Sequence, residues 1–260
     1  MNYQEASREL KGALRMRTEP LGAAFLAEAA SLPEKTRRPS QVLGKRVTIC
    51  QGVTMARVYG WPVGLTPEDL ICVPGMLAFG LAPEPDPGQE MARILCDVGF
   101  HEEIGSAQQE VEALSRLSPQ EIGAVYLAPL ERLALEPEVI VVYGSPAQLM
   151  RLIQGAAFGL GERATGDFGG KIECSSYLIG PHKTGQVRVT IPGMGDRIFS
   201  MTQDDEMVVS FPARLLPDIL KGMAEAGKKI GARYPVTFYQ NFQPEFPQPY
   251  KDRAKKWGIL

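Results

Sequence analysis

Histidine is almost absent from the chain, and this scarcity excludes several common kinds of active site. Only His101 and His182 occur among 260 residues. A Ser–His–Asp triad needs a histidine base beside its nucleophile, and catalytic zinc sites usually include histidine ligands. The sequence also contains no HExxH, GxSxG or GxxxxGK[ST] motif. We therefore do not expect the corresponding metalloprotease, hydrolase or phosphate-loop chemistry.

Long apolar runs and a strong net charge are also missing. No apolar run reaches the roughly 18 residues that a membrane-spanning helix needs, and the formal net charge is only −2. The chain therefore lacks the global positive field that would hold nucleic acid or an anionic membrane, and we expect neither partner. The charged start, MNYQEASRELKGALRMR, has no apolar signal-peptide core. These features predict a cytoplasmic protein.

Closely spaced cysteines are the third absence. The four cysteines are spread along the chain, and no CxxC pair occurs. In a chain that is not secreted, they are expected to be thiols or metal ligands and not disulfides. Cys50, Cys72 and Cys174 stand at junctions between expected elements, where each is either a buried small hydrophobe or a metal ligand. For Cys50, a nucleophile is a third interpretation. Cys96 lies inside an expected helix among apolar neighbours, where a buried filler is expected.

Local patterns predict a mixture of helices and strands. An amphipathic helix is expected over 3–15. VIVVYG (139–144) is typical of a strand buried in a sheet, and Ser145 followed by Pro146 is a helix start. KRVTIC (45–50) alternates like a short strand, and PGMGDR (192–197) is expected to form a tight loop. Further helices are expected over 88–98, 105–115 and 213–229, and further strands over 124–130, 186–191 and 206–212.

This mixture, with 44% hydrophobic and 22% charged residues, is typical of a globular protein. We expect an α/β or α+β fold in which residues 1–232 form one compact domain, with a mixed sheet flanked by helices. Residues 233–260 are expected to be an extended tail. The tail is rich in aromatic side chains whose exposure to water is unfavourable. We therefore expect it to pack on the domain, on a second copy in a homodimer, or on a partner enzyme. These side chains are Phe238, Tyr239, Phe242, Phe246, Tyr250 and Trp257.

Two further segments offer polar groups for a small molecule. Ser145, Gln148 and Arg151 begin a helix after a buried strand, at the kind of crevice where open α/β sheets bind ligands. The alternative is a capped core helix with structural polar groups. Asp196 and Arg197 in the GMGDR loop are candidates for binding an anion, and the alternative is a turn with a structural ion pair.

Several ordered segments resemble the domain of unknown function 169 family of bacteria and archaea, over roughly residues 5–232. The first segment carries CQ-x-x-x-x-AR, which corresponds here to Cys50, Gln51, Ala56 and Arg57. The second has a cysteine before a Gly- and Ala-rich run, here Cys72, although CVPG replaces the expected C-x-G-G. SPAQLMRLIQ, GMGDR and a later cysteine before a P-x-x-x-G loop, Cys174, also match, whereas Cys96 has no counterpart. The resemblance implies a grouping and not a function, because the family has no established activity.

The cysteines that match the family pattern are the three at junctions. Three thiolates without a nearby histidine suit an iron–sulfur cluster better than catalytic zinc. We therefore predict a [4Fe–4S] cluster or other metal on Cys50, Cys72 and Cys174, supported by Gln51 and Arg57. One open iron would serve redox or Lewis-acid chemistry on a small molecule in anaerobic metabolism. The alternative is a metal-free small-molecule-binding or accessory subunit that uses the helix at 146–159 and the GMGDR loop.

Overall fold

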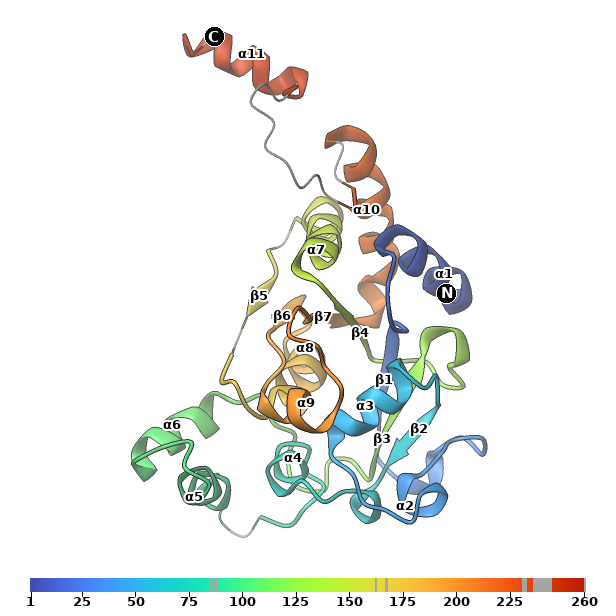
Figure 1. Cartoon of the computed structure of the whole chain (residues 1–260), viewed down its shortest axis with the longest axis vertical. Coiled ribbons are helices and arrows are strands. Elements are labelled where there is room, and N and C mark those ends of the chain that lie inside the picture. Colours follow the sequence, from blue (N-terminus) through green and yellow to red (C-terminus); the bar gives the residue numbers. More distant parts are fainter. Residues whose placement is uncertain are drawn as a thin grey trace.

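A mixed β-sheet runs through the body of the protein (Figure 1). The computed structural model describes residues 1–84, 86, 88–161, 163–166, 168–230, 233–235 and 245–259. Within these ranges the sheet has seven strands in the order β2-β3-β1-β4-β7-β6-β5. Only β5 and β6 pair in parallel, and the other five pairings are antiparallel. The strands are β1 (Leu21–Leu26), β2 (Val63–Leu65), β3 (Ala124–Pro129), β4 (Val139–Gly144), β5 (Thr165–Gly166), β6 (Arg188–Thr190) and β7 (Met207–Pro212).

Helices cover both faces of this sheet, which confirms the expected α/β class with a mixed sheet. A π-helix, Ser175–Ile179, directly precedes one of the α-helices. The α-helices are α1 (Tyr3–Leu14), α2 (Pro39–Val42), α3 (Ile49–Arg57), α4 (Val73–Ala78), α5 (Gln89–Asp97), α6 (Ile104–Ala113), α7 (Pro146–Leu160), α8 (Gly180–Thr184), α9 (Met194–Phe199), α10 (Leu216–Ile230) and α11 (Gln248–Lys256).

The central strand β4 shows how the sheet separates two cores. Every residue of β4 is buried, and successive side chains point to opposite faces of a strand. Val141 and Tyr143 belong to the core beneath α3, α4 and the π-helix. Ile140 and Val142 belong to the core beneath α1, α7 and α10. We refer to these as the α3 face and the α7 face of the sheet.

The contact between α7 and α10 is close because two glycines meet there. A Cβ atom placed on Gly222 would lie 2.0 Å from the backbone oxygen of Gly155. No side chain larger than hydrogen fits at that distance. The two helices therefore pack backbone against backbone on the α7 face.

Two local predictions are wrong, and capping explains both. The expected strand 45–50 is limited to a bridge between Val47 and Leu70, and α3 already begins at Ile49. Thr48 and Gln51 form a reciprocal capping box that begins this helix. The expected loop 192–197 contains the start of α9, because Asp196 accepts a hydrogen bond from the Gly193 amide at 3.3 Å.

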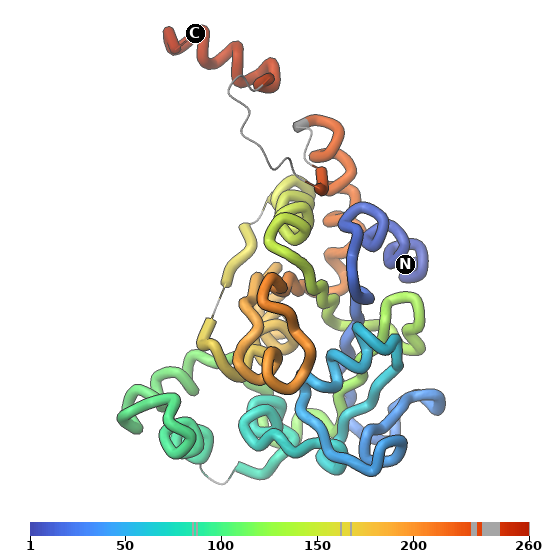
Figure 2. Tube along the Cα trace, viewed as in Figure 1, coloured from blue at the N-terminus to red at the C-terminus, as the bar shows by residue number. Residues whose placement is uncertain are grey.

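The last described helix, α11, has no buried residue. In the trace it lies beyond the end of α10, away from the sheet (Figure 2). Phe238, Tyr239 and Phe242 of the expected aromatic tail lie outside the described residues, and the packing of the tail on the domain or a partner remains a prediction. None of the helices in the described ranges has the length and apolar character needed to cross a membrane.

Candidate functional site

The three junction cysteines line one cavity on the α3 face of the sheet. The cavity has a volume of about 140 Å³, and Cys50, Cys72 and Cys174 all border it. The remaining lining is largely apolar. Its charged members are Lys171, Glu173 and Asp196.

Each of these cysteines lies at the beginning of a helical segment. Cys50 is the second residue of α3, Cys72 directly precedes α4, and Cys174 directly precedes the π-helix. Glycines border two of the sulfurs. A Cβ atom on Gly75 would lie 3.4 Å from Cys72 Sγ, and one on Gly195 would lie 3.7 Å from Cys50 Sγ. Separate segments therefore bring the three sulfurs to one small space without large side chains at these two contacts.

Cys96 lies elsewhere. It is half-buried in α5, where it packs against the hydrophobic core, and it does not border the cavity. This position agrees with the filler role expected from the sequence. It also makes Cys96 a natural control for experiments on the other three cysteines.

Burial holds the cavity thiols in their neutral form. It raises the pKa of Cys50 to about 11, with a smaller contribution from the nearby Asp196 carboxylate. The Thr48 hydroxyl oxygen, 2.9 Å from Cys50 Sγ, opposes this shift. Burial also raises the pKa of Cys72, and it raises that of Cys174 well above the ordinary value. None of the three is therefore activated as a free thiolate nucleophile at neutral pH.

Asp196 is a buried acid whose oxygens are already occupied. The residue is only 3% exposed. The Tyr177 hydroxyl donates to Oδ1 at 2.8 Å and the Tyr143 hydroxyl at 3.3 Å, while the Gly193 amide donates to Oδ2. Burial raises the pKa of Asp196, and the two phenol hydrogen bonds oppose that shift. These bonds fix the carboxyl group at the wall of the cavity.

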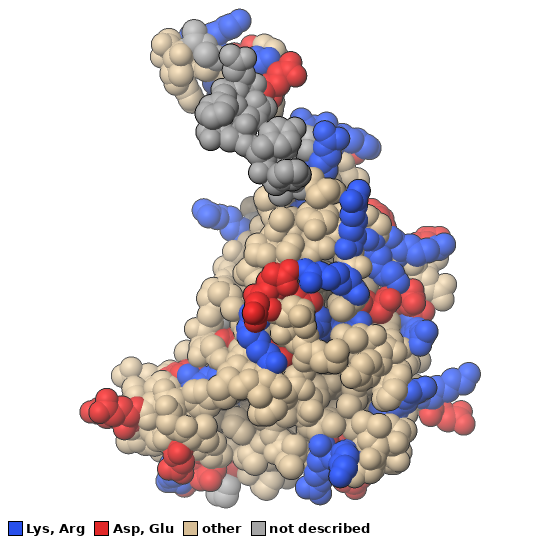
Figure 3. Space-filling view, in the orientation of Figure 1, with Lys and Arg blue, Asp and Glu red and all other residues tan. Residues whose placement is uncertain are grey.

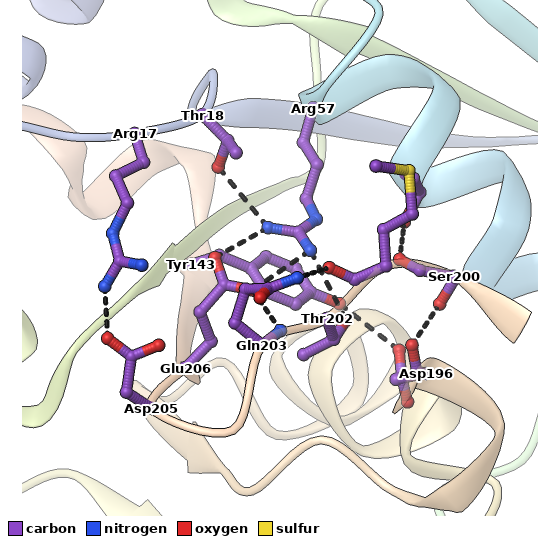
Figure 4. Close-up of polar contacts among 12 residues, drawn as sticks. Arg17, Thr18, Arg57, Tyr143, Asp196, Ser200, Thr202, Gln203, Asp205 and Glu206 are labelled. Carbon is purple, nitrogen blue, oxygen red and sulfur yellow. Dashed lines mark hydrogen bonds and ion pairs between the residues drawn. The ribbon is translucent and has the colours of Figure 1, made fainter. Parts of the chain in front are cut away.

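Arg57 belongs to a buried ion pair behind this wall (Figure 4). Its guanidinium donates to both carboxylate oxygens of Glu206, at 2.9 and 3.1 Å. The same group lies over the Tyr143 ring, with its central carbon 4.1 Å from the ring centroid. Tyr143 in turn donates to Asp196. Arg57 therefore does not border the cavity but supports it through Tyr143.

Glu173 is the acid in the cavity with a free oxygen. It is only 1% exposed, and its Oε1 accepts hydrogen bonds from the amides of Gly169 and Gly170 at 2.6 and 2.7 Å. Its Oε2 is buried and accepts no hydrogen bond of ordinary geometry from a described residue, although the Ser176 hydroxyl lies near enough to the carboxyl group to oppose the rise in its pKa. Burial raises the pKa of Glu173. The neighbouring Lys171 is directed to Glu110 instead, with its Nζ 2.6 Å from Glu110 Oε2.

The polar residues at the start of α7, which the sequence suggested as ligand-binding groups, form hydrogen bonds within the protein instead. Ser145 and Gln148 cap the helix, and the Gln148 amide also donates to the carbonyls of Leu14 and Arg15 at 2.7 and 3.1 Å. Arg151 donates to the Met223 carbonyl at 3.0 Å. All of these contacts lie on the α7 face. The structure therefore does not bring these three residues to the cysteine cavity.

Two other candidates also have structural contacts. Gln51 accepts from the Thr48 amide at 2.8 Å in the cap of α3 and does not border the cavity. Arg197 donates to the carbonyls of Gln203 and Glu206, at 2.6 and 3.4 Å, and so holds the loop before β7. Of the GMGDR pair, only Asp196 reaches the cavity.

Sequence reasoning missed the polar residues that support the cavity. In the sequence, Tyr143 is part of an apolar strand and Glu206 is one of several consecutive acids. Neither was therefore recognised as a candidate site residue. The alternation of β4 placed Tyr143 on the same face as Val141, which is the one signal that would have indicated its direction. Nothing local indicated that Glu206 would pair with Arg57, 149 positions away.

The donor set of the cavity is rich in sulfur, but it does not converge on one point. In the described part of the chain, no three side chains of His, Cys, Asp or Glu are grouped closely enough to hold a metal ion. A single zinc ion needs ligands within about 2.3 Å of one centre. The cavity is therefore not a preformed site for one ion.

Comparisons with known proteins give one result. Neither the curated proteins nor the solved structures contain a significant match to the chain. A family model described as uncharacterised ArCR, the domain of unknown function 169, matches residues 9–222. The resemblance inferred from the cysteine and GMGDR segments is thereby confirmed, and the chain belongs to the domain of unknown function 169 family.

Proposed function

We propose that the protein binds an iron–sulfur cluster through Cys50, Cys72 and Cys174 and acts on a small molecule by redox or Lewis-acid chemistry. The observation that carries the proposal is that three cysteines far apart in the sequence border one cavity, while Cys96 does not. The proposal includes a cytoplasmic, oxygen-free setting, because a cluster with an open iron is readily damaged by oxidants.

The chemistry of the donor set supports a cluster over a single ion. Thiolates favour iron–sulfur clusters and other soft metals, and neither histidine of the chain borders the cavity. A cluster binds each thiolate to a different iron, so its ligands need not meet at one point. This requirement is compatible with three sulfurs around a shared cavity that, among the described residues, lacks a single-ion site.

Three cysteine ligands would leave one iron of a [4Fe–4S] cluster without a protein ligand. Glu173 is the residue of this chain that can bind there. A cluster bound here would supply electron transfer or Lewis acidity at that position. The unpartnered Glu173 Oε2 can bind the open position, or it can accept a hydrogen bond from a small molecule in the cavity. The two glycine amides hold the other oxygen in place. Asp196, with both oxygens occupied, is assigned a positioning role.

Neutral thiols make cluster binding dependent on pH. Burial raises the pKa values of all three, so the metal-free protein retains the thiol protons at neutral pH. Ligation needs the thiolate, so each sulfur that binds must release a proton. Binding therefore becomes stronger as the pH rises towards the thiol pKa values. The N-terminal end of α3 partly favours the thiolate of Cys50.

The test is purification and reconstitution of the full-length protein without oxygen, with measurement of iron, sulfide and visible absorption. Wild type and Cys96→Ser should contain the same amounts of iron and sulfide and should absorb violet-blue light equally. Cys50→Ser, Cys72→Ser and Cys174→Ser should each lose most of both while keeping the far-ultraviolet circular dichroism of a folded protein. A folded wild type that stays colourless and iron-free after reconstitution would contradict the proposal.

The alternative function is metal-free binding of a small molecule, or an accessory role beside a partner enzyme. The observation that favours it is a cavity with neutral thiols and one free carboxyl oxygen. The helix α7, expected to provide this site, has its polar groups bonded within the protein. The cavity itself would then be the binding site. Ligands that raise the melting temperature of the metal-free wild type, but not of Glu173→Gln, would support this alternative.

A further inference from the structure

The C-terminal helix α11 carries an apolar face that nothing in the described part of the chain covers. Phe246, Tyr250 and Trp257 lie along this face and are 50%, 66% and 67% exposed. They line a shallow groove with Ala254 and Ile259. A helix of nine residues is marginal in water unless its apolar face packs against another surface. The helix therefore needs a partner.

The charge of this segment defines the kind of surface that suits it. Residues 245–259 contain four basic side chains and two acidic ones. All four basic residues lie within α11, and three of them are exposed. A matching surface must combine apolar side chains with negative charge. The basic residues are Lys251, Arg253, Lys255 and Lys256.

The hairpin formed by α5 and α6 has this combination. Residues 89–113 contain six acidic side chains and a single basic one, Arg93. At the tip of the hairpin, Val98 and Ile104 are 62% and 44% exposed. The exposed acids Asp97, Glu102 and Glu103 surround them and form no ion pair with a described residue. Figure 3 shows the acidic side chains at this end of the molecule.

We propose that α11 of one chain binds the α5–α6 hairpin of a second copy of the same chain. The two surfaces have opposite charge, and each exposes apolar side chains that association would bury. They lie at opposite ends of the longest axis of the molecule (Figure 1). A symmetric dimer can form this contact twice, with each chain giving one helix and receiving one.

The proposed contact lies beside the cysteine cavity. Phe100, in the turn between α5 and α6, borders that cavity. A helix bound at the tip of the hairpin would therefore come next to the cavity of the other copy. The dimer contact depends on complementary charge and exposed apolar side chains and does not depend on what the cavity holds.

Two charge reversals test the proposal in the full-length protein. The hairpin variant Glu102→Lys/Glu103→Lys and the helix variant Lys255→Glu/Lys256→Glu each place like charges across the contact. Wild type should sediment as a dimer at low salt, and each variant alone should dissociate, with dimer affinity reduced by about tenfold or more. Mixed in equal amounts, the two variants should form a heterodimer in which both contacts are complementary, one with the wild-type charges and the other with both charges reversed.

Matched controls separate the contact from general charge effects. Lys45→Glu/Arg46→Glu changes the net charge as much as the helix variant does, and Glu28→Lys/Glu34→Lys as much as the hairpin variant. All four residues are exposed and distant in sequence from the proposed contact. Both controls should stay dimeric.

Three results would overturn the proposal. The first is a wild type that is monomeric at every concentration, including one in which α11 binds anionic lipid vesicles instead. The second is a dimer that neither reversal weakens. The third is a pair of monomeric variants that fails to form the heterodimer when mixed.

Discussion

The two faces of the sheet use buried polar side chains in different ways. On the α7 face, Gln148 and Arg151 extend to backbone carbonyls of neighbouring segments, so their polar groups hold helices together. On the α3 face, Glu173 has an oxygen without a partner among the described residues, and it borders a cavity that also has three neutral thiols. Buried polar groups without partners are rare and destabilising. Under the proposed function, the α7 face is structural and the α3 face retains groups for a ligand.

The largest stability effect is expected behind the wall of the cavity, at Arg57. Arg57→Met leaves Glu206 buried without its cation, and this should lower the free energy of unfolding by about 3–5 kcal/mol. Urea denaturation measures the change. Arg17→Met is the control, because Arg17 pairs with Asp205 at an exposed position beside Glu206. That change should cost less than about 1 kcal/mol. Equal losses in the two variants would contradict a special role for the buried pair.

The α7 face should respond most to a change in packing. Gly222→Ala places a Cβ atom 2.0 Å from the Gly155 carbonyl oxygen, so α7 and α10 must move apart. We expect a loss of about 1–3 kcal/mol in the free energy of unfolding. Gly12→Ala in α1 is the control, because no atom lies within 4 Å of its new Cβ. That variant should be slightly more stable than wild type, since alanine favours helix formation. Iron binding should survive both changes.

The Cys50 thiol should make the stability of the metal-free protein depend on pH. Its pKa is about 11 when folded and near 9 when unfolded. The folded state thus retains a proton that the unfolded state releases between these values, so stability decreases as the pH rises through this window. The decrease attributable to Cys50 should reach about 3 kcal/mol. Cys50→Ser removes this part of the slope, whereas Cys96→Ser should leave it unchanged. Parallel pH profiles for wild type and Cys50→Ser would contradict the assignment.

The smallest stability effect is expected for Glu173→Gln. It distinguishes the proposed ligand site on the α3 face from the structural contacts on the α7 face. Glu173→Gln keeps the shape of the side chain and an oxygen that can accept from the Gly169 and Gly170 amides, so the free energy of unfolding should change by less than about 1 kcal/mol. Iron content or the electron paramagnetic resonance spectrum of the reconstituted protein should change nonetheless. Gln148→Ala should show the opposite result: a loss of about 1–2 kcal/mol in stability with unchanged iron binding. A spectrum of Glu173→Gln identical to wild type would remove Glu173 from the site.

Local signals in the sequence were sufficient for much of the fold. The apolar strand VIVVYG followed by Ser145 and Pro146 predicted β4 and α7 because strand burial and helix capping are local properties. The strand expected at 45–50 failed because its alternation was given more weight than Thr48 and Gln51, whose spacing is that of a capping box. The error is local, because the expected strand overlaps α3 only at Ile49 and Cys50.

The candidate site depends on contacts that no local pattern encodes. The sequence indicated which cysteines stand at junctions, but not that their segments would surround one cavity. The ion pair of Arg57 with Glu206 and the free oxygen of Glu173 arise from tertiary packing. For the same reason, Ser145, Gln148 and Arg151 looked available in the sequence although their polar atoms are bonded to distant backbone groups.

The π-helix after Cys174 sets the direction of the third sulfur. A π-turn fits one more residue into a helix than an α-turn does, and so it rotates the segment before it by about 100° relative to the segment after it. The buried residues Tyr177, Leu178 and Ile179 can therefore keep their packing while Cys174 takes a different direction. Deleting one residue from Ser175–Ile179 would straighten the helix and turn the sulfur away from its two companions. The register of the helix at Ser175–Ile179 thus contributes to the direction of Cys174.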